Sequence, residues 1–596
     1  MNRWRTSLLV LAFSLATAGI PVVAAADASS AADSQLRTLY ETEWSWSLRE
    51  NGQVEDDEGG FARAAYLPRV DAASQERRAA YWRDMLAALD RVPQGKLSDE
   101  EQVNAAVFRT NLEHALIEAR FREWEMPFNS DSSFWTYLDA RRPFRTAEEY
   151  RRYISRMRDI PRYFAEHTEN MRAGLVRGFS VPRATLDGRE QSIATYTEGN
   201  FEANPFYAAF TSMPATIPAD EQAALREEAK AAIREAVIPA YSNLRVFFRN
   251  EYLPKARTTL AATAMPDGEA YYAAQIRKYT TLDLTAEQIH EIGLKEVARI
   301  NAEMRQVMKE SGFRGSFEDF LVFLRTDPQF YAKTPDELLS FSAWVAKRVD
   351  GKIADTIGFL PRRPFTIVPV PEALAPFYTA GRGGLGSCQM NTYNLPSRPL
   401  YNIPALTLHE CSPGHSFQAA LAKEQPERPA FRRNTYFSGY GEGWGLYTEW
   451  LGIQMGIYRT PYEHFGRLSY EMWRAARLVI DTGIHRYGWS RQQAIDYLAG
   501  HTALSQHEVE TEVDRYISWP GQALAYKLGE MTIRRLRAEA EEKLGRNFDQ
   551  RRFHDTILAL GSVPLPVLEG RIARFVDEEL KRTATAEKAS PGIHAK

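Results

Sequence analysis

The chain has 596 residues, of which 44% are hydrophobic and 25% are charged, and its formal net charge is -3. This composition is typical of a globular protein, and the length exceeds what one hydrophobic core usually fills, so we expect two lobes. Basic residues are dispersed among acidic ones along the chain, which argues against a nucleic acid as its partner.

The first 26 residues have the pattern of a secretory signal peptide. Arg3 and Arg5 precede an apolar run over residues 7–23, and the three alanines at 24–26 form a cleavage site of small residues. The run is rich in alanine and no charged stop follows it, which favours cleavage over a membrane anchor. Cleavage removes two arginines and no acid, which changes the net charge from -3 to -5. We therefore expect a periplasmic or secreted protein without a stable membrane anchor.

Amphipathic helical periodicity dominates the rest of the chain. The helices that it predicts cover residues 103–118, 147–174, 219–252, 285–311 and 491–498. Strand signals are scarce: the best one covers residues 365–370, and residues 391–401 are expected to be extended. The sequence therefore predicts a mainly α fold with one small β-sheet.

A stretch with turn-forming residues at 262–268 interrupts the helical periodicity. We expect an N-terminal helical lobe over residues 27–260 and a C-terminal lobe over residues 261–582. The polar residues 583–596 are predicted to form a disordered tail.

The segment His409-Glu410-Cys411-Ser412-Pro413-Gly414-His415 carries the strongest chemical signal. Imidazoles are good zinc ligands, and a carboxylate beside a metal-bound water is a natural general base. The zinc-peptidase motif H-E-x-x-H spaces its histidines by four positions, whereas His409 and His415 are six positions apart. On a straight helix such a step rotates the second side chain by about 120°, away from the first. Because Pro413 and Gly414 interrupt the helix, we expect a bulge there that returns His415 to the face of His409.

The chain has two cysteines, Cys388 and Cys411. A disulfide between them and two buried free thiols are both compatible with the sequence. Cys411 lies inside the histidine motif, where we expect it to pack rather than to bind a metal. The chain is not a scaffold built from disulfides.

A third metal ligand is expected from the segment around Glu442. This residue follows His415 by 27 positions, which leaves room for a turn and a returning antiparallel helix. Glu449 lies two helical turns later on about the same face, and is a candidate to orient a ligand. We therefore predict one Zn²⁺ ion held by His409, His415 and Glu442, with Glu410 as the general base.

Polar and aromatic residues further along the chain are candidates for substrate recognition. His485, Tyr516 and Tyr526 could donate to an oxyanion, and Asp481 is placed to orient His485 four positions later. A structural histidine and an aromatic core with basic tips are the alternatives. The residues expected to bind the substrate are Arg474, Arg477, Arg515, Gln522 and Lys527.

Together these segments resemble the bacterial "domain of unknown function 885" family, which carries the signature of zinc metallopeptidases. The matching segments are residues 391–396, 406–410, 413–415, 442–449, 481–485 and 515–527. The resemblance implies a helical peptidase fold with a deep cleft, similar to thermostable carboxypeptidases and angiotensin-converting-enzyme-like peptidases. Those relatives use H-E-x-x-H and a downstream glutamate, and this chain departs from them by two inserted residues. Many family members also have a second histidine after the motif, where this chain has Ser416.

The sequence thus predicts a zinc-dependent peptidase that acts on small peptides, in the manner of a carboxypeptidase, with residues 261–582 as its catalytic lobe. Two alternatives are a metal-dependent hydrolase of a non-peptide amide or ester, and a non-catalytic helical binding protein. The first uses the same site with other substrates, and the second predicts ligand binding without turnover.

Overall fold

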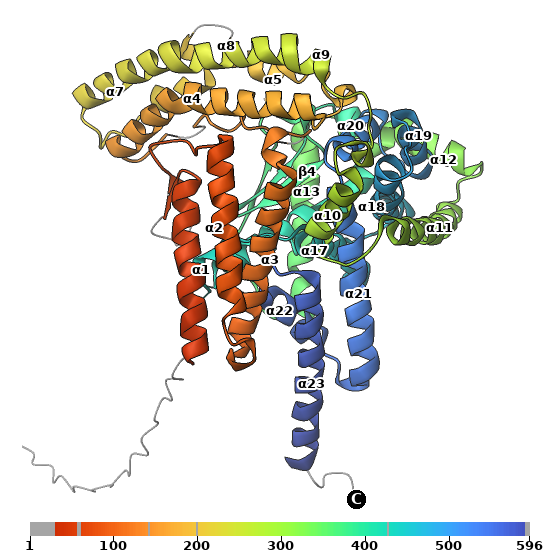
Figure 1. Ribbon diagram of the computed structural model, residues 1–596. Coiled ribbons are helices and arrows are strands. Elements are labelled where there is room, and N and C mark those ends of the chain that lie inside the picture. The colour runs from red at the N-terminus through yellow and green to blue at the C-terminus, as the bar shows by residue number, and fades with distance from the viewer. Residues whose placement is uncertain are drawn as a thin grey trace, which may run out of the picture.

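The computed structural model describes residues 30–55, 61–130, 132–140, 143–197, 201–372, 374–425 and 428–589. The predicted signal peptide lies outside these residues. Within them the fold is mainly α-helical, with one two-stranded and one three-stranded sheet, which confirms the predicted fold class (Figure 1). No helix in the described ranges combines the length and the apolar character that a membrane span requires.

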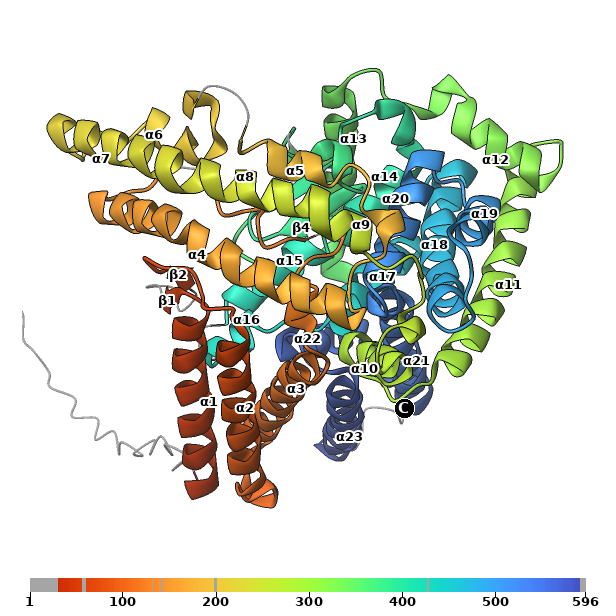
Figure 2. The ribbon, with the colours of Figure 1, turned by 45° about the horizontal axis from the view of Figure 1, so that its top comes forward.

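The N-terminal helices form two groups that cross each other (Figures 1 and 2). The helices of the first group lie side by side, and a small hairpin connects the first two of them. The second group lies across one end of the first. The first group consists of α1 (Ala31–Glu50), β1 (Gln53–Glu55), β2 (Phe61–Arg63), α2 (Ala72–Asp90) and α3 (Asp99–Phe121). The second group consists of α4 (Ala147–Arg177), α5 (Glu190–Ala194), α6 (Ala208–Thr211), α7 (Ala219–Ala232), α8 (Ile238–Phe247) and α9 (Leu253–Lys255).

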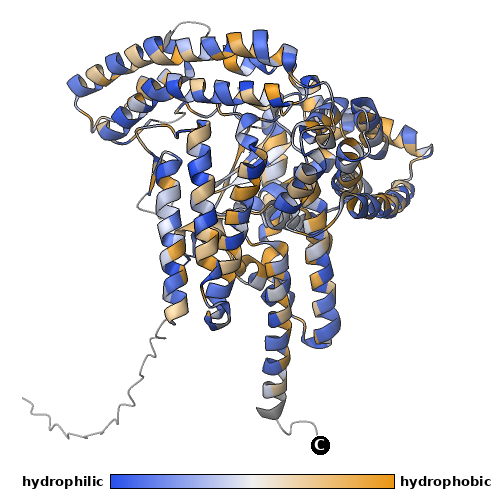
Figure 3. Ribbon diagram, in the orientation of Figure 1, coloured by the Kyte–Doolittle hydropathy of each residue, from blue (hydrophilic) through white to orange (hydrophobic). Residues whose placement is uncertain are grey.

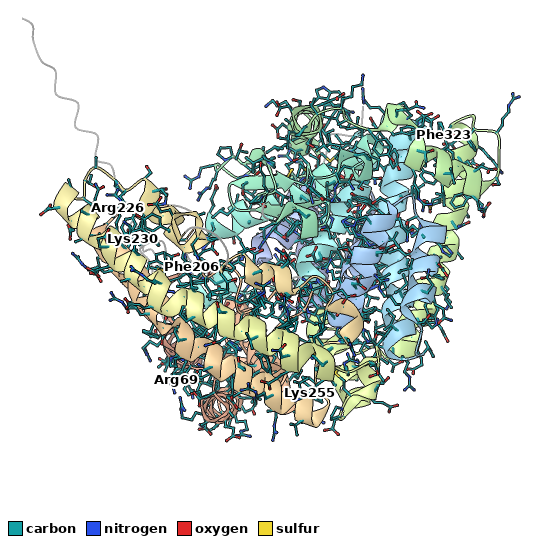
Figure 4. All side chains as sticks on the ribbon, turned by 90° about the horizontal axis from the view of Figure 1, so that it is seen from above. Arg69, Phe206, Arg226, Lys230, Lys255 and Phe323 are labelled. Carbon is teal, nitrogen blue, oxygen red and sulfur yellow. A yellow bond between two sulfur atoms is a disulfide. The ribbon has the colours of Figure 1, made fainter. Side chains whose placement is uncertain are left out.

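One long helical path runs from α7 through α8 to α9, as the sequence predicts for residues 219–252. Two π-helical turns, Ile233–Val237 and Phe248–Tyr252, interrupt it. Each turn comes just before a proline, Pro239 or Pro254, and a proline nitrogen has no hydrogen for the regular α-helical bond. Seen from above, this path extends from Arg226 and Lys230 to Lys255 along one side of the molecule (Figure 4). Its mixture of apolar and polar residues fits a helix with one buried face (Figure 3).

The remaining chain forms the helices and strands around the candidate site. They are α10 (Gly268–Thr280), α11 (Ala286–Glu310), α12 (Phe317–Thr326), α13 (Pro335–Asp350), β3 (Thr366–Pro369), β4 (Gly381–Gly384), β5 (Ser387–Met390), α14 (Ile403–Glu410), α15 (His415–Lys423), α16 (Ala430–Asn434), α17 (Ser438–Gln454), α18 (Pro461–His485), α19 (Arg491–His501), α20 (Gln506–Ser518), α21 (Ala525–Leu544), α22 (Gln550–Leu560) and α23 (Leu565–Ala589). Strand β5 pairs with β3 in parallel and with β4 antiparallel.

Helix α18 is the central element, because every residue over 465–485 is buried. It packs along α11 on one side and contacts α14, α20 and α21. Several of its buried residues are charged, among them Arg467, Glu471, Arg474 and Arg477. Because a buried charge is costly without a partner, these residues must find oppositely charged groups on neighbouring helices.

Two predictions of local structure are wrong in part. Residues 391–401 are not extended throughout, since Leu395–Ser397 and Leu400–Asn402 are 3₁₀ turns next to prolines that fix the backbone. The predicted disordered tail from residue 583 starts inside α23, which continues to Ala589. Residues 583–589 are mostly alanine, lysine and glutamate, which favour a helix, and Arg582 donates hydrogen bonds back to Glu579.

The hydrophobic cores connect distant parts of the sequence. One core joins Leu36 and Phe108 of the N-terminal helices to Trp444 and Phe553 of the C-terminal half. Another contains only residues between 67 and 256. The division into lobes at residue 260 stays a prediction.

Candidate metal centre

The histidine motif spans the end of one helix and the start of the next. Helix α14 ends at Glu410, α15 begins at His415, and the Ser412–Pro413 peptide bond between them is cis. The predicted bulge within one helix is thus a complete break between two helices. The turn is tight, since a β-carbon on Gly414 would lie 1.8 Å from the carbonyl oxygen of His409. Glycine is therefore required at this position.

The break brings the two imidazoles together beside Glu442. The ring centroids of His409 and His415 are 4.8 Å apart. The Oε2 atom of Glu442 lies 3.4 Å from Nε2 of His409 and 3.1 Å from Nε2 of His415. One ligand atom from each of the three residues lies within 4.8 Å of the other two. Two imidazole nitrogens and one carboxylate oxygen form a donor set that suits Zn²⁺.

Helix α17 supplies both Glu442 and a buried partner for His409. Nδ1 of His409 lies 2.7 Å from Oε1 of Glu449, and the same oxygen lies 3.3 Å from Nη2 of Arg474. A β-carbon on Gly445 would lie 2.8 Å from the His409 ring, so the helix can approach this closely only with glycine there. Carboxylates in this position commonly fix the orientation of a metal-binding histidine. Arg474, predicted to bind the substrate, therefore also holds Glu449.

The three candidate ligands form a charged cluster. Burial lowers the pKa of His409, but the hydrogen bonds with Glu442 and Glu449 outweigh this effect and raise it to about 9. Burial raises the pKa of Glu442, but the charge of His415 and the hydrogen bond with His409 hold it well below its usual value. His409 thus carries a proton near pH 7 that a metal ion would displace, so metal binding would release protons.

Glu410 is fixed by the small sheet rather than by its own helix. Its Oε2 accepts a hydrogen bond of 2.6 Å from the backbone N–H of Gly383 in β4. The neighbouring residue Cys411 forms a disulfide with Cys388 of β5, with Cα atoms 5.3 Å apart. The disulfide settles the choice between a bridge and two free thiols. It connects the sheet covalently to the residue after Glu410.

The candidate ligands and Glu410 line a cavity of about 1590 Å³. Residues over 129–139 and 184–196 form part of its wall, and α15, α16, α18 and α20 form other parts. Ligand sites for small molecules usually measure about 300–1,000 Å³, so this cavity has room for a larger ligand. The predicted substrate-binding and oxyanion residues that line it are Arg474, Arg477, Arg515, Gln522 and Tyr526.

Of the predicted residues, His485 does not reach the cavity. Its Nδ1 accepts a hydrogen bond from the backbone of Ala262 at 3.0 Å, and its Nε2 donates to the carbonyl of Tyr516 at 2.9 Å. Burial lowers the pKa of His485 to about 3, so the ring is neutral. Asp481 does not orient it, because that carboxylate accepts hydrogen bonds from Tyr272 and Gly521. The catalytic role predicted for His485 is wrong, and the residue ties three segments together.

Tyr516 and Lys527 also lie behind the cavity wall. The hydroxyl of Tyr516 accepts hydrogen bonds from Trp473 at 2.8 Å and Arg477 at 3.0 Å. Lys527 is fully buried, and its Nζ lies within 3.0 Å of three carboxylates, those of Glu296, Glu471 and Glu530. These contacts leave Lys527 unable to bind a substrate carboxylate, and they assign Tyr516 a role in holding Arg477.

Sequence reasoning missed Tyr436, which lines the cavity next to the metal ligands. The residue is 56% exposed, so burial contributes little, and the negative charge of the neighbouring Glu442 raises the pKa of its hydroxyl. Its ring lies against Gly441, where a β-carbon would be 2.3 Å away. The sequence signal that could have indicated Tyr436 is the run of aromatic and glycine residues before Glu442. The same run is equally typical of residues that pack in a core.

We expect Asp481 to make stability depend on pH. Burial raises its pKa to about 7 from 3.8, so between about pH 4 and pH 7 the folded chain keeps a proton that the unfolded chain has lost. The free energy of unfolding should therefore fall as the pH rises through this window. Asp481→Asn should flatten the profile, which urea unfolding at a series of pH values would measure. Parallel profiles for the two proteins would contradict the assignment.

The family model described as "Bacterial protein of unknown function (DUF885)" matches residues 55–572. The chain belongs to the DUF885 family. Its match includes every candidate metal ligand, Glu410 and the arginines of the cavity wall.

Solved structures that resemble this DUF885 protein include the following two. A "putative lipoprotein" from Colwellia psychrerythraea is 27% identical, with a TM-score of 0.84 over 92% of this chain and 100% of that one. A "putative lipoprotein of unknown function" from Shewanella oneidensis is 18% identical, with a TM-score of 0.63 over 91% and 99% of the two chains, and shows the fold alone. No curated protein matches the chain.

Proposed function

We propose that this chain is a zinc-dependent peptidase that hydrolyses small peptides. The observation that carries the proposal is the convergence of His409, His415 and Glu442, whose ligand atoms lie within 4.8 Å of one another. Glu410 follows the first ligand directly in the chain, and all four residues line one large cavity. This combination supports a metal site with a general base beside it and with space for a peptide.

The roles of the side chains follow from their contacts. A zinc ion held by the three ligands would act as a Lewis acid and lower the pKa of a bound water. Glu410, held by the N–H of Gly383, would accept a proton from the attacking water and return it to the leaving amine. The hydroxyl of Tyr526 accepts a hydrogen bond of 3.0 Å from Arg515, which leaves its own hydrogen to donate to the oxyanion.

We also propose that the protein works outside the cytoplasm, in the periplasm or beyond it. The disulfide between Cys388 and Cys411 supports this location, because disulfides persist in oxidising compartments. The Colwellia structure is of a chain described as a "putative lipoprotein", which supports this location further. The signal-peptide pattern of residues 1–26 agrees with both observations.

Metal analysis combined with a peptide digest tests the proposal. Protein purified without chelator should contain about one zinc per chain by mass spectrometry, as one site of three ligands predicts. A mixture of peptides should be cleaved by this protein, and a chelator should stop the cleavage. Protein that neither contains nor takes up a transition metal would overturn the proposal. Cleavage of acyl amides or esters without cleavage of peptides would favour the non-peptide hydrolase instead.

A further inference from the structure

A second cavity lies on the N-terminal helices, where the end of α1 and the start of α2 reach α4 (Figure 2). It measures about 710 Å³, and none of its lining residues lines the cavity of the candidate metal ligands. Seen from above, its residue Arg69 lies at the edge of the molecule (Figure 4). Five arginines line this arginine cavity, namely Arg49, Arg69, Arg77, Arg158 and Arg162.

Two acids also line the arginine cavity, but each is already bonded to an arginine. Oδ2 of Asp159 lies 2.6 Å from Nη2 of Arg162. Oε2 of Glu50 lies 3.0 Å from Nε of Arg78, a buried residue that is not part of the lining. The charge of Glu50 is therefore balanced behind the wall, and Asp159 balances one lining arginine.

Three of the five arginines form no ion pair within the described ranges, namely Arg49, Arg77 and Arg158. Arg69, in contrast, has Glu166 at 3.1 Å. Arg77 donates to a nearby serine hydroxyl at 3.1 Å, which carries no charge. The three unpaired arginines come from three different helices, α1, α2 and α4, and all are exposed, so a ligand can reach them.

A buried arginine beneath the arginine cavity adds to the positive charge. Arg156 donates a hydrogen bond of 3.0 Å to the backbone carbonyl of Tyr66, which lines the cavity. Arg156 forms no ion pair in the part of the chain that the structure describes. Burial, and then the positive charge of Arg63, lower the pKa of Arg156 to about 10, so the group stays charged near neutral pH. This end of the N-terminal helices therefore has more positive than negative charge, which attracts anions.

The chemistry of the lining indicates the class of ligand. A guanidinium group is a planar fork of donors that matches the oxygens of a phosphate group. The volume of the arginine cavity lies in the range of about 300–1,000 Å³ that is usual for small-molecule sites. One phosphate monoester carries a charge of about -1.5 to -2 at pH 7, which is less than three unpaired arginines require. A ligand with two phosphate groups balances these charges better.

We propose that the arginine cavity binds a ligand that carries two phosphate groups, and that Arg49, Arg77 and Arg158 contact these groups. The site is separate from the candidate metal centre, so the proposal does not depend on the peptidase function. Two phosphate groups occur both in soluble pyrophosphates and in the headgroup of cardiolipin. The experiment therefore distinguishes a soluble ligand from a lipid.

Calorimetry on the full chain, with inorganic pyrophosphate as the probe, tests the site. Pyrophosphate should bind about ten-fold or more tightly than inorganic phosphate, because its second phosphate group adds charge-assisted hydrogen bonds. Arg158→Gln and Arg49→Gln should each weaken pyrophosphate binding by about ten-fold. Both side chains are exposed and form no ion pair within the described ranges, so these variants should fold normally. Arg234→Gln, at an exposed position outside both cavities, should bind pyrophosphate as the unmodified protein does.

Sedimentation with phosphatidylcholine vesicles that contain cardiolipin identifies the source of the phosphate groups. Co-sedimentation that pyrophosphate competes away and Arg158→Gln weakens would support a lipid headgroup as the ligand. Pyrophosphate binding without co-sedimentation would support a soluble ligand.

Two results would overturn the arginine cavity as a binding site. One is the absence of both pyrophosphate binding and co-sedimentation at low ionic strength, where screening of exposed charges is weakest. The other is pyrophosphate binding that Arg49→Gln and Arg158→Gln leave unchanged, or that Arg234→Gln weakens equally. Such binding would take place elsewhere on the protein, for example at the candidate metal centre.

Discussion

Glu410→Gln should lower kcat/KM for peptides by about 10²–10⁴-fold, the usual contribution of a general base. The glutamine oxygen can still accept the hydrogen bond from Gly383, but it cannot take a proton from water. Zinc content should stay unchanged, because Glu410 is not one of the three converging ligands. Steady-state kinetics and metal analysis on the same preparation measure both effects.

A matched control for this variant is Glu539→Gln. Glu539 pairs with Arg535 on the exposed face of α21, away from the cavity. The Glu539→Gln protein should cleave peptides and bind zinc as the unmodified protein does. Wild-type turnover by Glu410→Gln would remove the general base from the mechanism, and loss of zinc from it would mean that Glu410 is itself a ligand.

Lys527→Met should lower the free energy of unfolding by about 3 kcal/mol, the lower end of the usual cost of breaking a buried pair. It removes the buried cation that three carboxylates share, but Arg299, Arg467 and Arg534 still pair with them. The ammonium group lies 2.9 Å from Glu471 and 2.8 Å from Glu530, and both acids are buried. Burial lowers the pKa of Lys527, but the charges of these carboxylates outweigh this effect and raise it above its usual value. The ammonium group therefore stays protonated near neutral pH. Chemical denaturation followed by circular dichroism would measure the change.

Lys347→Met provides the comparison, since the side chain of Lys347 is 82% exposed and forms a surface pair with Asp350. It should leave the free energy of unfolding nearly unchanged. A Lys527→Met protein of normal stability with a raised KM for peptides would restore the substrate-binding role that the sequence suggested.

The convergence of His409, His415 and Glu442 could be predicted because its signals are local. Pro413 and Gly414 must interrupt a helix, and a returning helix at the spacing of Glu442 is a short-range consequence. The long amphipathic helices are predictable for the same reason, since their periodicity is written in consecutive residues. The observed ends differ from the predicted ones by a few positions, as at α3 and α19.

The roles of His485, Tyr516 and Lys527 could not be predicted in this way. Each depends on partners far away in the chain, such as Ala262 for His485 and Glu296 for Lys527. A polar residue on a buried helix looks the same in sequence whether it faces a cavity or another helix. Asp481 and His485 are four positions apart, yet Tyr272 and Gly521 occupy the carboxylate instead.

The bond between Cys388 and Cys411 has a practical consequence for biochemical work on the protein. It closes a loop that contains the last strand of the sheet and the helix bearing His409 and Glu410. Recombinant chain made in a reducing bacterial cytosol would lack this closure, and the loop would be held by non-covalent contacts alone. Lack of activity in protein from such a host would therefore reflect the missing disulfide. Protein for enzymology should be exported to an oxidising compartment.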